Sequence, residues 1–449
     1  MSPDQITPIL QRLQDTNPLD PDPAYEGAVK YRDWYIENLH PVYADVVKLL
    51  SLEVQDSIGS RHAYLFSGTI GSGKSTELRR LAYGLKQKGH HAAVVNIMDY
   101  LNPQMAVGVA DLLMAIALGA WESSAKARNI DANAGEHFAW WASLLRARPE
   151  GKELEISGGP VKMKFALQAN PVYRERLRQF FASSLDELVR ETNKFMAELA
   201  DNIRTDLGLA KDAKCLLVID SLEHFGGFAL AGQSDEVLKS LLEVFNTFNR
   251  YLRLDGWSLV YSVPPLLQKL APGLAATFGS TNTYYLTSAH VFNDRSDLVD
   301  DTTVDNKLVP LTLRRLSCDA DLLFAHGVLR DVVVKTGGDL RDLLRTLRSV
   351  LLMGLADNTF PVTMVQLERV YNNLRRPYLP LPLDTAVRLR HVRLKKEPLL
   401  ASADDWPSVM SDLAAKRVLL YLNGVEWYDV HPLLRDVVDS STPPVVVPG

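Results

Sequence analysis

The sequence predicts an α/β fold with a mostly parallel five-stranded sheet, and three observations lead to this fold class. Short apolar runs of strand length alternate with longer stretches in which apolar residues recur at helical spacing. Two of the runs end in a glycine-rich or acidic turn, as strands do at the ligand-binding edge of open parallel sheets. After about residue 307 the pattern becomes helical and closes with one hairpin signal.

Composition narrows the class of protein. The chain has 449 residues, of which 47% are hydrophobic and 23% charged, which is an ordinary globular balance sufficient for two or three domains. A net charge of −5 gives no bulk attraction to nucleic acid or anionic lipid. The only cysteines, Cys215 and Cys318, lie in apolar segments, which favours a reducing compartment. The start lacks a signal-peptide pattern, and the apolar stretch 106–121 is too short to span a bilayer. We therefore expect a cytoplasmic protein without a membrane contact.

Residues 68–76 fit the phosphate-binding pattern G-x-x-x-x-G-K-[ST] at every position. An apolar run precedes the motif and an amphipathic segment follows it, which is the strand–loop–helix setting that the motif requires. Glycines let backbone N–H groups approach phosphate oxygens, Lys74 would reach the β- and γ-phosphates, and the Ser75 hydroxyl would bind Mg²⁺. The competing interpretation is a glycine-rich turn that carries a lysine by chance. The predicted ATP-binding residues of this P-loop NTPase core are Gly68, Thr69, Ile70, Gly71, Ser72, Gly73, Lys74, Ser75 and Thr76.

A second chemical signal is the apolar run 215–219, which ends in Asp220. A run of this kind is typical of a parallel strand buried on both faces, and an acid at its end is placed to hold Mg²⁺ through water. Asp220 and Ser75 are therefore the predicted metal ligands. Glu223 is the next acid and the candidate catalytic base. It either polarises the attacking water or stabilises the helix that follows, as a first-turn acid.

The segment 336–347 predicts a second phosphate contact. Gly337 and Gly338 end one helix and Asp339 caps the next, which places Arg341 in the first turn. The planar guanidinium of Arg341 suits a γ-phosphate, and we count Arg341 among the catalytic residues. The alternative is a surface salt bridge between Arg341 and Asp342 or a neighbouring residue.

Four segments, at 71–81, 217–223, 261–265 and 337–345, together resemble the bacterial AAA+/STAND-like ATPases related to the origin-recognition group. Several of these ATPases belong to anti-phage or mobile-element operons, and the resemblance covers about residues 60–355. It implies that Ser262, at the end of a further strand, senses the γ-phosphate; the alternative is a buried serine that donates to backbone. The family usually has a glutamate where this chain has Ser221, so hydrolysis is expected to be slow.

The same resemblance implies self-association, with ATP at subunit interfaces and an arginine finger supplied by a neighbouring subunit. Arg314, Arg315 and Arg295 are the candidates for that finger.

Residues 362–438 resemble a winged-helix module, with Asn423-Gly424 as the turn of the wing. A basic cluster precedes this hairpin and contains a single acid, Asp384, between Arg369 and Lys396. The cluster either binds the DNA backbone or faces an acidic partner surface while the module packs on the lid. The predicted DNA contacts are Arg375, Arg376, Arg388, Arg390, Arg393, Lys395 and Lys396.

The resulting domain plan has five parts. They are an N-terminal arm and helices (1–60), the P-loop ATPase core (61–307) with a hairpin inserted near 154–165, a helical lid (308–360), a winged-helix-like domain (361–440) and a disordered tail (441–449). The sequence contains no nuclease, protease or deaminase pattern, so we expect a separate effector protein. The predicted function is an ATP-dependent switch or oligomeric assembly component in bacterial anti-phage defence. The alternative is a DNA-binding ATPase of replication-initiation or transposition type.

Overall fold

The computed structural model divides the chain into two compact units, which are described separately. One unit consists of Met1–Asp45, Thr69–Thr76 and Leu286–Gly449, and the other of Val46–Gly68 and Glu77–Tyr285. We call them the lid unit and the sheet unit. The structure describes residues 2–25, 27–40, 45–57, 61–131, 159–181, 184–225, 233–265, 267–271, 273–278, 283–402 and 405–441.

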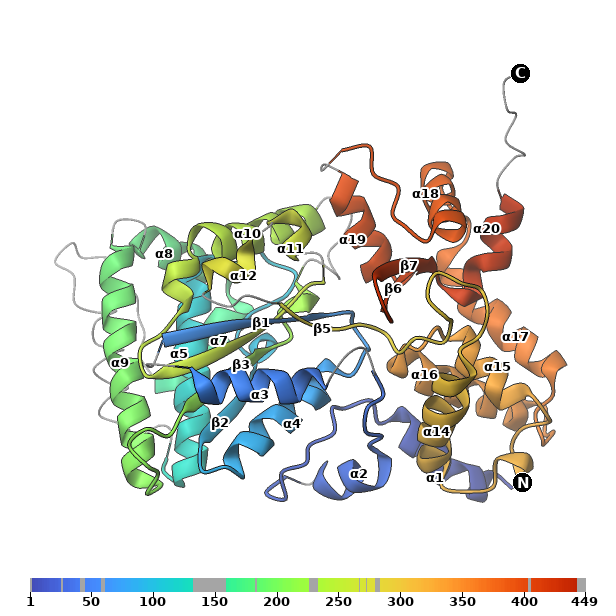
Figure 1. Ribbon diagram of the computed structural model, residues 1–449, viewed down its shortest axis with the longest axis horizontal. Helices are drawn as coiled ribbons and strands as arrows, with labels where there is room; N and C mark the ends of the chain where they lie inside the picture. Colours follow the sequence, from blue (N-terminus) through green and yellow to red (C-terminus); the bar gives the residue numbers. More distant parts are fainter. Residues whose placement is uncertain are drawn as a thin grey trace. The chain divides into compact units, whose positions relative to one another are not determined.

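A five-stranded sheet forms the centre of the sheet unit, with strand order β2-β3-β4-β1-β5 (Figure 1). The pairs β1·β4, β3·β4 and β2·β3 are all parallel, as the sequence predicts. Crossovers between parallel strands need connecting helices, and the helical stretches between the runs supply them. The strands are β1 (Arg61–Gly68), β2 (His91–Asn96), β3 (Cys215–Asp220), β4 (Trp257–Val263) and β5 (Tyr284–Leu286).

Alternate residues of these strands face opposite sides of the sheet, because side chains in a strand alternate with a period of two. Leu217 of β3 and Leu259 of β4 belong to the larger hydrophobic core, to which α5 and α9 also contribute. Tyr64 of β1 faces the other side, where its hydroxyl donates to the carbonyl of Glu53 in α3 at 3.4 Å. The helical elements of this unit are α3 (Val46–Asp56), α4 (Lys74–Lys86), η1 (Ile97–Asp99), α5 (Val109–Arg128), α7 (Gly159–Ala169), α8 (Pro171–Phe181), α9 (Leu185–Asp206), η2 (Leu222–His224), α10 (Gln233–Thr247), η3 (Asn249–Leu252), α11 (Leu267–Leu270) and α12 (Leu274–Thr277).

Helices dominate the lid unit and enclose a second core. Ile6, Ile9 and Leu13 are at most 2% exposed and pack into this core with residues of α14 and α16. The helical elements are α1 (Pro3–Gln14), α2 (Gly27–Trp34), α13 (Asp301–Thr303), the π-helical turn η4 (Val304–Leu308), α14 (Val309–Leu316), η5 (Ala320–Leu322), α15 (Val328–Lys335), α16 (Leu340–Ala356), α17 (Met364–Arg375), η6 (Arg376–Tyr378), α18 (Leu383–Lys395), α19 (Trp406–Ala414), η8 (Pro432–Leu434) and α20 (Arg435–Ser441).

The predicted hairpin at Asn423-Gly424 is confirmed. Strands β6 (Val418–Leu422) and β7 (Glu426–Val430) pair antiparallel, with Leu422 opposite Glu426 across the turn. The hairpin is not a freely projecting wing, however, because Tyr421 and Trp427 are fully buried in the second core.

Two sequence predictions are wrong. The arm predicted at the start of residues 1–60 is instead helical over Pro3–Gln14, where α1 buries its apolar stripe because residues 6, 9 and 13 fall on one helix face. The hairpin expected near 154–165 is also absent over 159–165, which lie in α7; residues 154–158 fall outside the described residues. Residues 442–449 of the predicted tail likewise lie outside them. Among the described residues, no helix combines the length and apolarity needed to cross a membrane.

Candidate nucleotide-binding site

The phosphate loop follows β1 and leads into α4, which begins at Lys74. Gly71 and Gly73 have φ values of +94° and +98°, a region that residues with a Cβ rarely adopt. Inside the loop, the N–H and the hydroxyl of Ser72 both donate to the carbonyl of Thr69, at 3.3 and 2.9 Å. The loop therefore has the compact, glycine-dependent turn that the motif predicts, which is the backbone form that a phosphate group requires.

Lys74 is buried, with 3% of its surface exposed. Its Nζ donates to the carbonyl of Thr69 at 2.7 Å, across the mouth of the loop. The hydroxyl of Thr69 in turn lies 3.4 Å from that of Ser288. A buried ammonium group inside a glycine turn is the donor set that binds an anion, because burial strengthens its interaction with a negative charge.

The N-terminal segment also contacts the phosphate loop, which the sequence did not reveal. The N–H of Leu19 donates to the hydroxyl of Thr76 at 3.0 Å. His40 hydrogen-bonds to the backbone of Ser72, and burial lowers the pKa of His40 to about 4. Hydrogen bonds over such sequence separations leave no local pattern that could have predicted them.

The predicted cap of α16 is confirmed, and it lies directly against the phosphate loop. Asp339 Oδ1 accepts the N–H of Asp342 at 2.9 Å, which is the N-cap interaction. A Cβ added to Gly71 would come within 2.4 Å of Asp339 Oδ2, and the N–H of Leu340 donates to the carbonyl of Gly71 at 3.2 Å. The start of α16 and the phosphate loop are therefore in direct contact.

Arg341 lies in the first turn of α16, as predicted. The alternative salt bridge to Asp342 does not form; Asp342 pairs instead with Lys416, at 2.8 Å. The partly exposed Arg341 side chain makes no ion pair or hydrogen bond to another residue of the described ranges. Its guanidinium is thus available to an anion. The backbone of the same helix turn is fixed by the N-cap bond of Asp339.

In the sheet unit, the two predicted acids lie at the carboxyl end of β3. Asp220, the last residue of β3, is 4% exposed and accepts the N–H of Ser221 at 2.8 Å. Ser221 has φ +76°, an uncommon value for a residue with a side chain, and the turn η2 follows it. Within this turn Glu223 is 8% exposed and accepts the hydroxyl hydrogen of Ser262, at 2.5 Å.

Strand register explains how Glu223 and Ser262 meet. Ile219 of β3 is level with Tyr261 of β4, and Ser262 is level with Phe66, two residues before Gly68. The ends of β3, β4 and β1 therefore lie at one edge of the sheet. This is the ligand-binding edge of open α/β sheets, so Asp220, Ser262 and the first glycine of the motif share it.

The predicted site residues are thus divided between the units. Thr69–Thr76 and Arg341 belong to the lid unit, whereas Gly68, Asp220, Glu223 and Ser262 belong to the sheet unit. A magnesium site made by Ser75 with Asp220 stays a prediction. Within the described residues, no group of three or more histidine, cysteine, aspartate and glutamate side chains is arranged to hold a metal.

All three arginine-finger candidates make internal contacts, and they differ in how exposed they remain. Arg315 is 6% exposed; it donates to the carbonyl of Asp15 at 2.9 Å and stacks over the ring of Trp34, and burial lowers its pKa to about 10. Arg314 donates to the carbonyl of Tyr35 at 2.5 Å. Arg295 is the more available candidate, with Glu397 at 3.8 Å and 45% of its side chain exposed.

The basic cluster of the C-terminal module is largely paired within the chain. Four of the seven predicted DNA contacts form ion pairs: Arg375 with Glu368, Arg388 with Asp412, Arg393 with Asp297, and Lys396 with both Asp297 and Asp429. These pairs lie between 2.6 and 3.2 Å. Sequence reasoning missed the pairing because most of the acids lie outside the cluster, so the positive charge that remains for a phosphate backbone is smaller than the sequence suggests.

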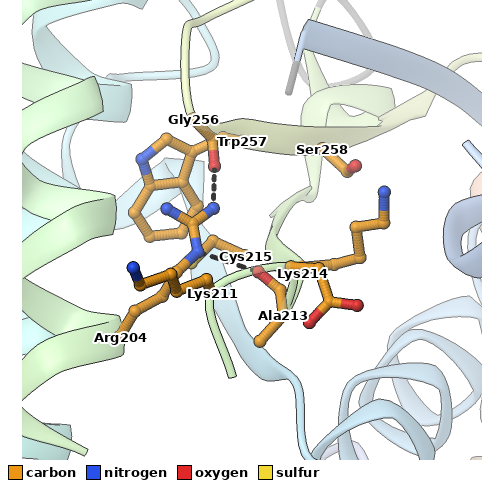
Figure 2. Close-up of a pocket in the computed structure, with 9 residues that line it drawn as sticks. Arg204, Lys211, Ala213, Lys214, Cys215, Gly256, Trp257 and Ser258 are labelled. Atoms are coloured by element: carbon orange, nitrogen blue, oxygen red, sulfur yellow. Dashed lines mark hydrogen bonds between the residues drawn. The ribbon is translucent and has the colours of Figure 1, made fainter. Parts of the chain in front are cut away.

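A cavity of about 290 Å³ lies at the opposite edge of the sheet, beside the first residues of β3 and β4 (Figure 2). Arg204 crosses it, donating to the carbonyls of Ala213 at 2.9 Å and Gly256 at 3.4 Å. Because the motif residues follow the carboxyl ends of the strands, this cavity is distinct from the candidate nucleotide site. The guanidinium of Arg204 in this cavity is bonded to backbone carbonyls.

No protein-family model matches the sequence, and no curated protein is significantly similar to it. Among solved structures, the ORC2 protein of Aeropyrum pernix in its ADPNP–ADP complexes is similar, with 10% identity, 96% of this chain and 98% of that chain covered, and a TM-score of 0.38.

Two further solved structures give comparable values. Drosophila ORC bound to DNA is 10% identical, with 97% of this chain and 90% of that chain covered and a TM-score of 0.39. Cdc6p from Pyrobaculum aerophilum is 12% identical, with 91% and 97% covered and a TM-score of 0.36. The fold assignment rests on the chain itself: a five-stranded parallel α/β sheet whose strand β1 leads into a phosphate loop and helix, which is a P-loop fold.

Proposed function

We propose that the protein is an AAA+-type ATPase related to the origin-recognition group, which binds Mg-ATP and works as a nucleotide-dependent switch. The observation that carries this proposal is the complete phosphate loop with its buried Lys74, at the end of a strand that shares the sheet edge with Asp220 and Ser262. A glycine turn alone would be weak support for nucleotide binding. A buried cation next to it and two polar groups at the strand ends are the groups that a nucleotide and its metal ion require.

Each residue has a distinct part in the proposed site. Backbone N–H groups of the loop and Lys74 would bind the phosphates, whereas Ser75 and Asp220 would hold the metal ion. Bound Mg²⁺ would neutralise charge that develops on the phosphate oxygens. Arg341, whose side chain makes no polar contact within the described residues, would bind the γ-phosphate.

Glu223 is the proposed base. Its carboxylate accepts the hydroxyl hydrogen of Ser262 at 2.5 Å, which sets the direction of one oxygen. A base needs an orienting partner of this kind to meet an attacking water. Through this bond Ser262 would position Glu223, and not bond to backbone as the alternative from the sequence had it. The γ-phosphate sensing that the resemblance implies for Ser262 stays a prediction. Because this base follows a turn at Ser221, we expect hydrolysis to be slow and the ATP-bound state to be long-lived.

The biological setting is proposed from the sequence resemblance. We propose a bacterial defence role in which the ATP-bound form self-associates and recruits a separate effector protein in the cytoplasm, with Arg295 as the remaining arginine-finger candidate. A replication-initiation or transposition role would require DNA binding by the C-terminal module. The intramolecular ion pairs of its arginines weaken the case for DNA binding by this module, since paired charges release few counterions from DNA.

Calorimetry with Mg-ATP and a matched pair of variants tests nucleotide binding. Lys74→Ala should abolish the heat of binding, whereas Lys88→Ala, which removes an exposed lysine just after α4, should bind as the wild type does. Wild-type protein that gives no heat would refute the proposal.

Measuring ATP turnover distinguishes the defence role from the replication-initiation or transposition role. Purified protein should hydrolyse ATP slowly and equally with and without duplex DNA, and Glu223→Gln should retain ATP binding while losing the turnover. Stimulation of turnover by DNA, lost in Glu223→Gln, would instead support the initiator-type alternative.

A further inference from the structure

Lys416 links the C-terminal module to the start of α16. It lies in the turn between α19 and β6 with φ +55°, and its N–H donates to the carbonyl of Leu413 at 3.0 Å. Its ammonium Nζ lies 2.9 Å from Asp339 Oδ2 and 2.8 Å from Asp342 Oδ1. Only 16% of the Lys416 side chain is exposed, so this cation is largely withdrawn from solvent.

The two acids belong to the first turn of α16, with Arg341 between them in sequence. Asp339 is 1% exposed. Burial raises the pKa of Asp339 and the Asp342 carboxylate raises it further, whereas Lys416 opposes both effects. Without a cation, two carboxylates this close would repel and the buried one would lose its charge. Lys416 therefore keeps both acids in place at this helix start.

Asp339, whose position is fixed by Lys416, also contacts the phosphate loop. Its carboxylate lies against Gly71, and the neighbouring Leu340 N–H bonds to the Gly71 carbonyl at 3.2 Å. Lys416, Asp339 and Gly71 thus form a continuous chain of contacts, entirely within the lid unit.

The two glycines before Asp339 are also held by hydrogen bonds. The Tyr421 hydroxyl, from β6, donates to the carbonyl of Gly337 at 2.8 Å, and the N–H of Ala289 donates to the carbonyl of Gly338 at 3.2 Å. A Cβ at Gly338 would lie 1.7 Å from the carbonyl oxygen of Ala289. The segment that leads to Arg341 is therefore bonded to the C-terminal hairpin through Tyr421, in addition to its ion pairs with Lys416.

We propose that Lys416 is a positioning residue for the nucleotide site: it holds the first turn of α16 against the phosphate loop and so sets Arg341 for the γ-phosphate. This inference rests on the proposed nucleotide-binding function and adds its regulation. A partner that moves the C-terminal module would change nucleotide preference through Lys416, without touching the nucleotide.

The test compares the affinities for a non-hydrolysable ATP analogue and for ADP, measured by calorimetry on the full chain. Their ratio reports the γ-phosphate contact of Arg341, which a merely structural role of Lys416 would leave unchanged. Lys416→Met should lower the ratio by about five- to tenfold, a fraction of one charge-assisted hydrogen bond. Lys88→Met removes an exposed lysine just after α4, outside the proposed site, and should leave the ratio unchanged.

A double-mutant cycle makes the test specific. If Lys416 acts through Arg341, the Arg341→Ala/Lys416→Met double variant should have the same ratio as Arg341→Ala alone. An additive effect of the two substitutions, or an unchanged ratio in Lys416→Met, would overturn the positioning role. Wild-type protein that binds neither nucleotide would instead refute the proposed function.

Two milder variants cover the case in which Lys416→Met does not fold. Lys416→Arg keeps the charge and should restore most of the wild-type ratio. Asp342→Asn removes one of the two ion pairs of Lys416 while leaving Asp339 in contact with Gly71, and it should lower the ratio by about two- to threefold. A wild-type ratio in Asp342→Asn together with a low ratio in Lys416→Arg would contradict the proposal.

Discussion

Replacing Gly71 by alanine probes the contact between the phosphate loop and α16. Gly71 has φ +94°, and its new Cβ would lie 2.4 and 2.5 Å from the two carboxylate oxygens of Asp339. Gly89 offers a matched control because it has φ +80° but no atom within 4 Å of the added Cβ. Both substitutions place an alanine at positive φ, and only Gly71→Ala also displaces Asp339.

The expected magnitudes follow from these two terms. An alanine in the left-handed region costs about 1–2 kcal/mol, which is the whole effect expected for Gly89→Ala. Gly71→Ala also pushes the Asp339 carboxylate from its N-cap position, and losing an N-cap costs about 1 kcal/mol more. We therefore expect Gly71→Ala to lower the free energy of unfolding by roughly 2–3 kcal/mol.

Hydrogen exchange locates the effect. In Gly71→Ala, amide exchange should accelerate in a peptide covering residues 337–345, because the Asp342 N–H loses its bond to Asp339. Gly89→Ala should leave this peptide unchanged, and denaturant unfolding gives the stability difference. Equal destabilisation by both variants, with unchanged exchange at 337–345, would show that Gly71 and Asp339 do not support each other.

Three further outcomes are expected. Ser262→Ala removes the 2.5 Å bond to Glu223 and should lower ATP turnover about tenfold while ATP affinity changes less than about threefold; equal losses in both would contradict an orienting role. His431 is 5% exposed, and burial lowers its pKa to about 4, so the unfolded state takes up the proton first as pH falls below about 6.5. Between pH 7 and 5 this residue should cost about 2 kcal/mol of stability, and denaturant unfolding of His431→Gln should show a shallower loss by that amount. Arg174, 1% exposed, pairs with the fully buried Asp111 at 3.1 Å, so Arg174→Met should lower the free energy of unfolding by about 3 kcal/mol, whereas an effect below 1 kcal/mol would show that Arg178 alone compensates Asp111.

The sequence by itself determined the features that depend on near neighbours in the chain. The phosphate loop, the strand that ends at Asp220, the cap at Asp339 and the turn at Asn423-Gly424 all occur where the residues predict them. Each is set by local backbone preferences or by a period of apolar residues, which a single sequence displays directly. For the same reason the helix α1 could have been predicted from its apolar spacing, although its burial could not.

Only the tertiary structure decided which charges meet. The bond from Ser262 to Glu223, the placement of Lys416 on two acids of α16, and the ion pairs of the basic cluster join residues that are up to about a hundred positions apart. Charged side chains have no periodic signature that names a distant partner, because the pairing depends on how the packed elements bring them together. The pairing that reduces the case for DNA binding and the contact that ties the C-terminal module to the phosphate loop are therefore properties of the folded chain.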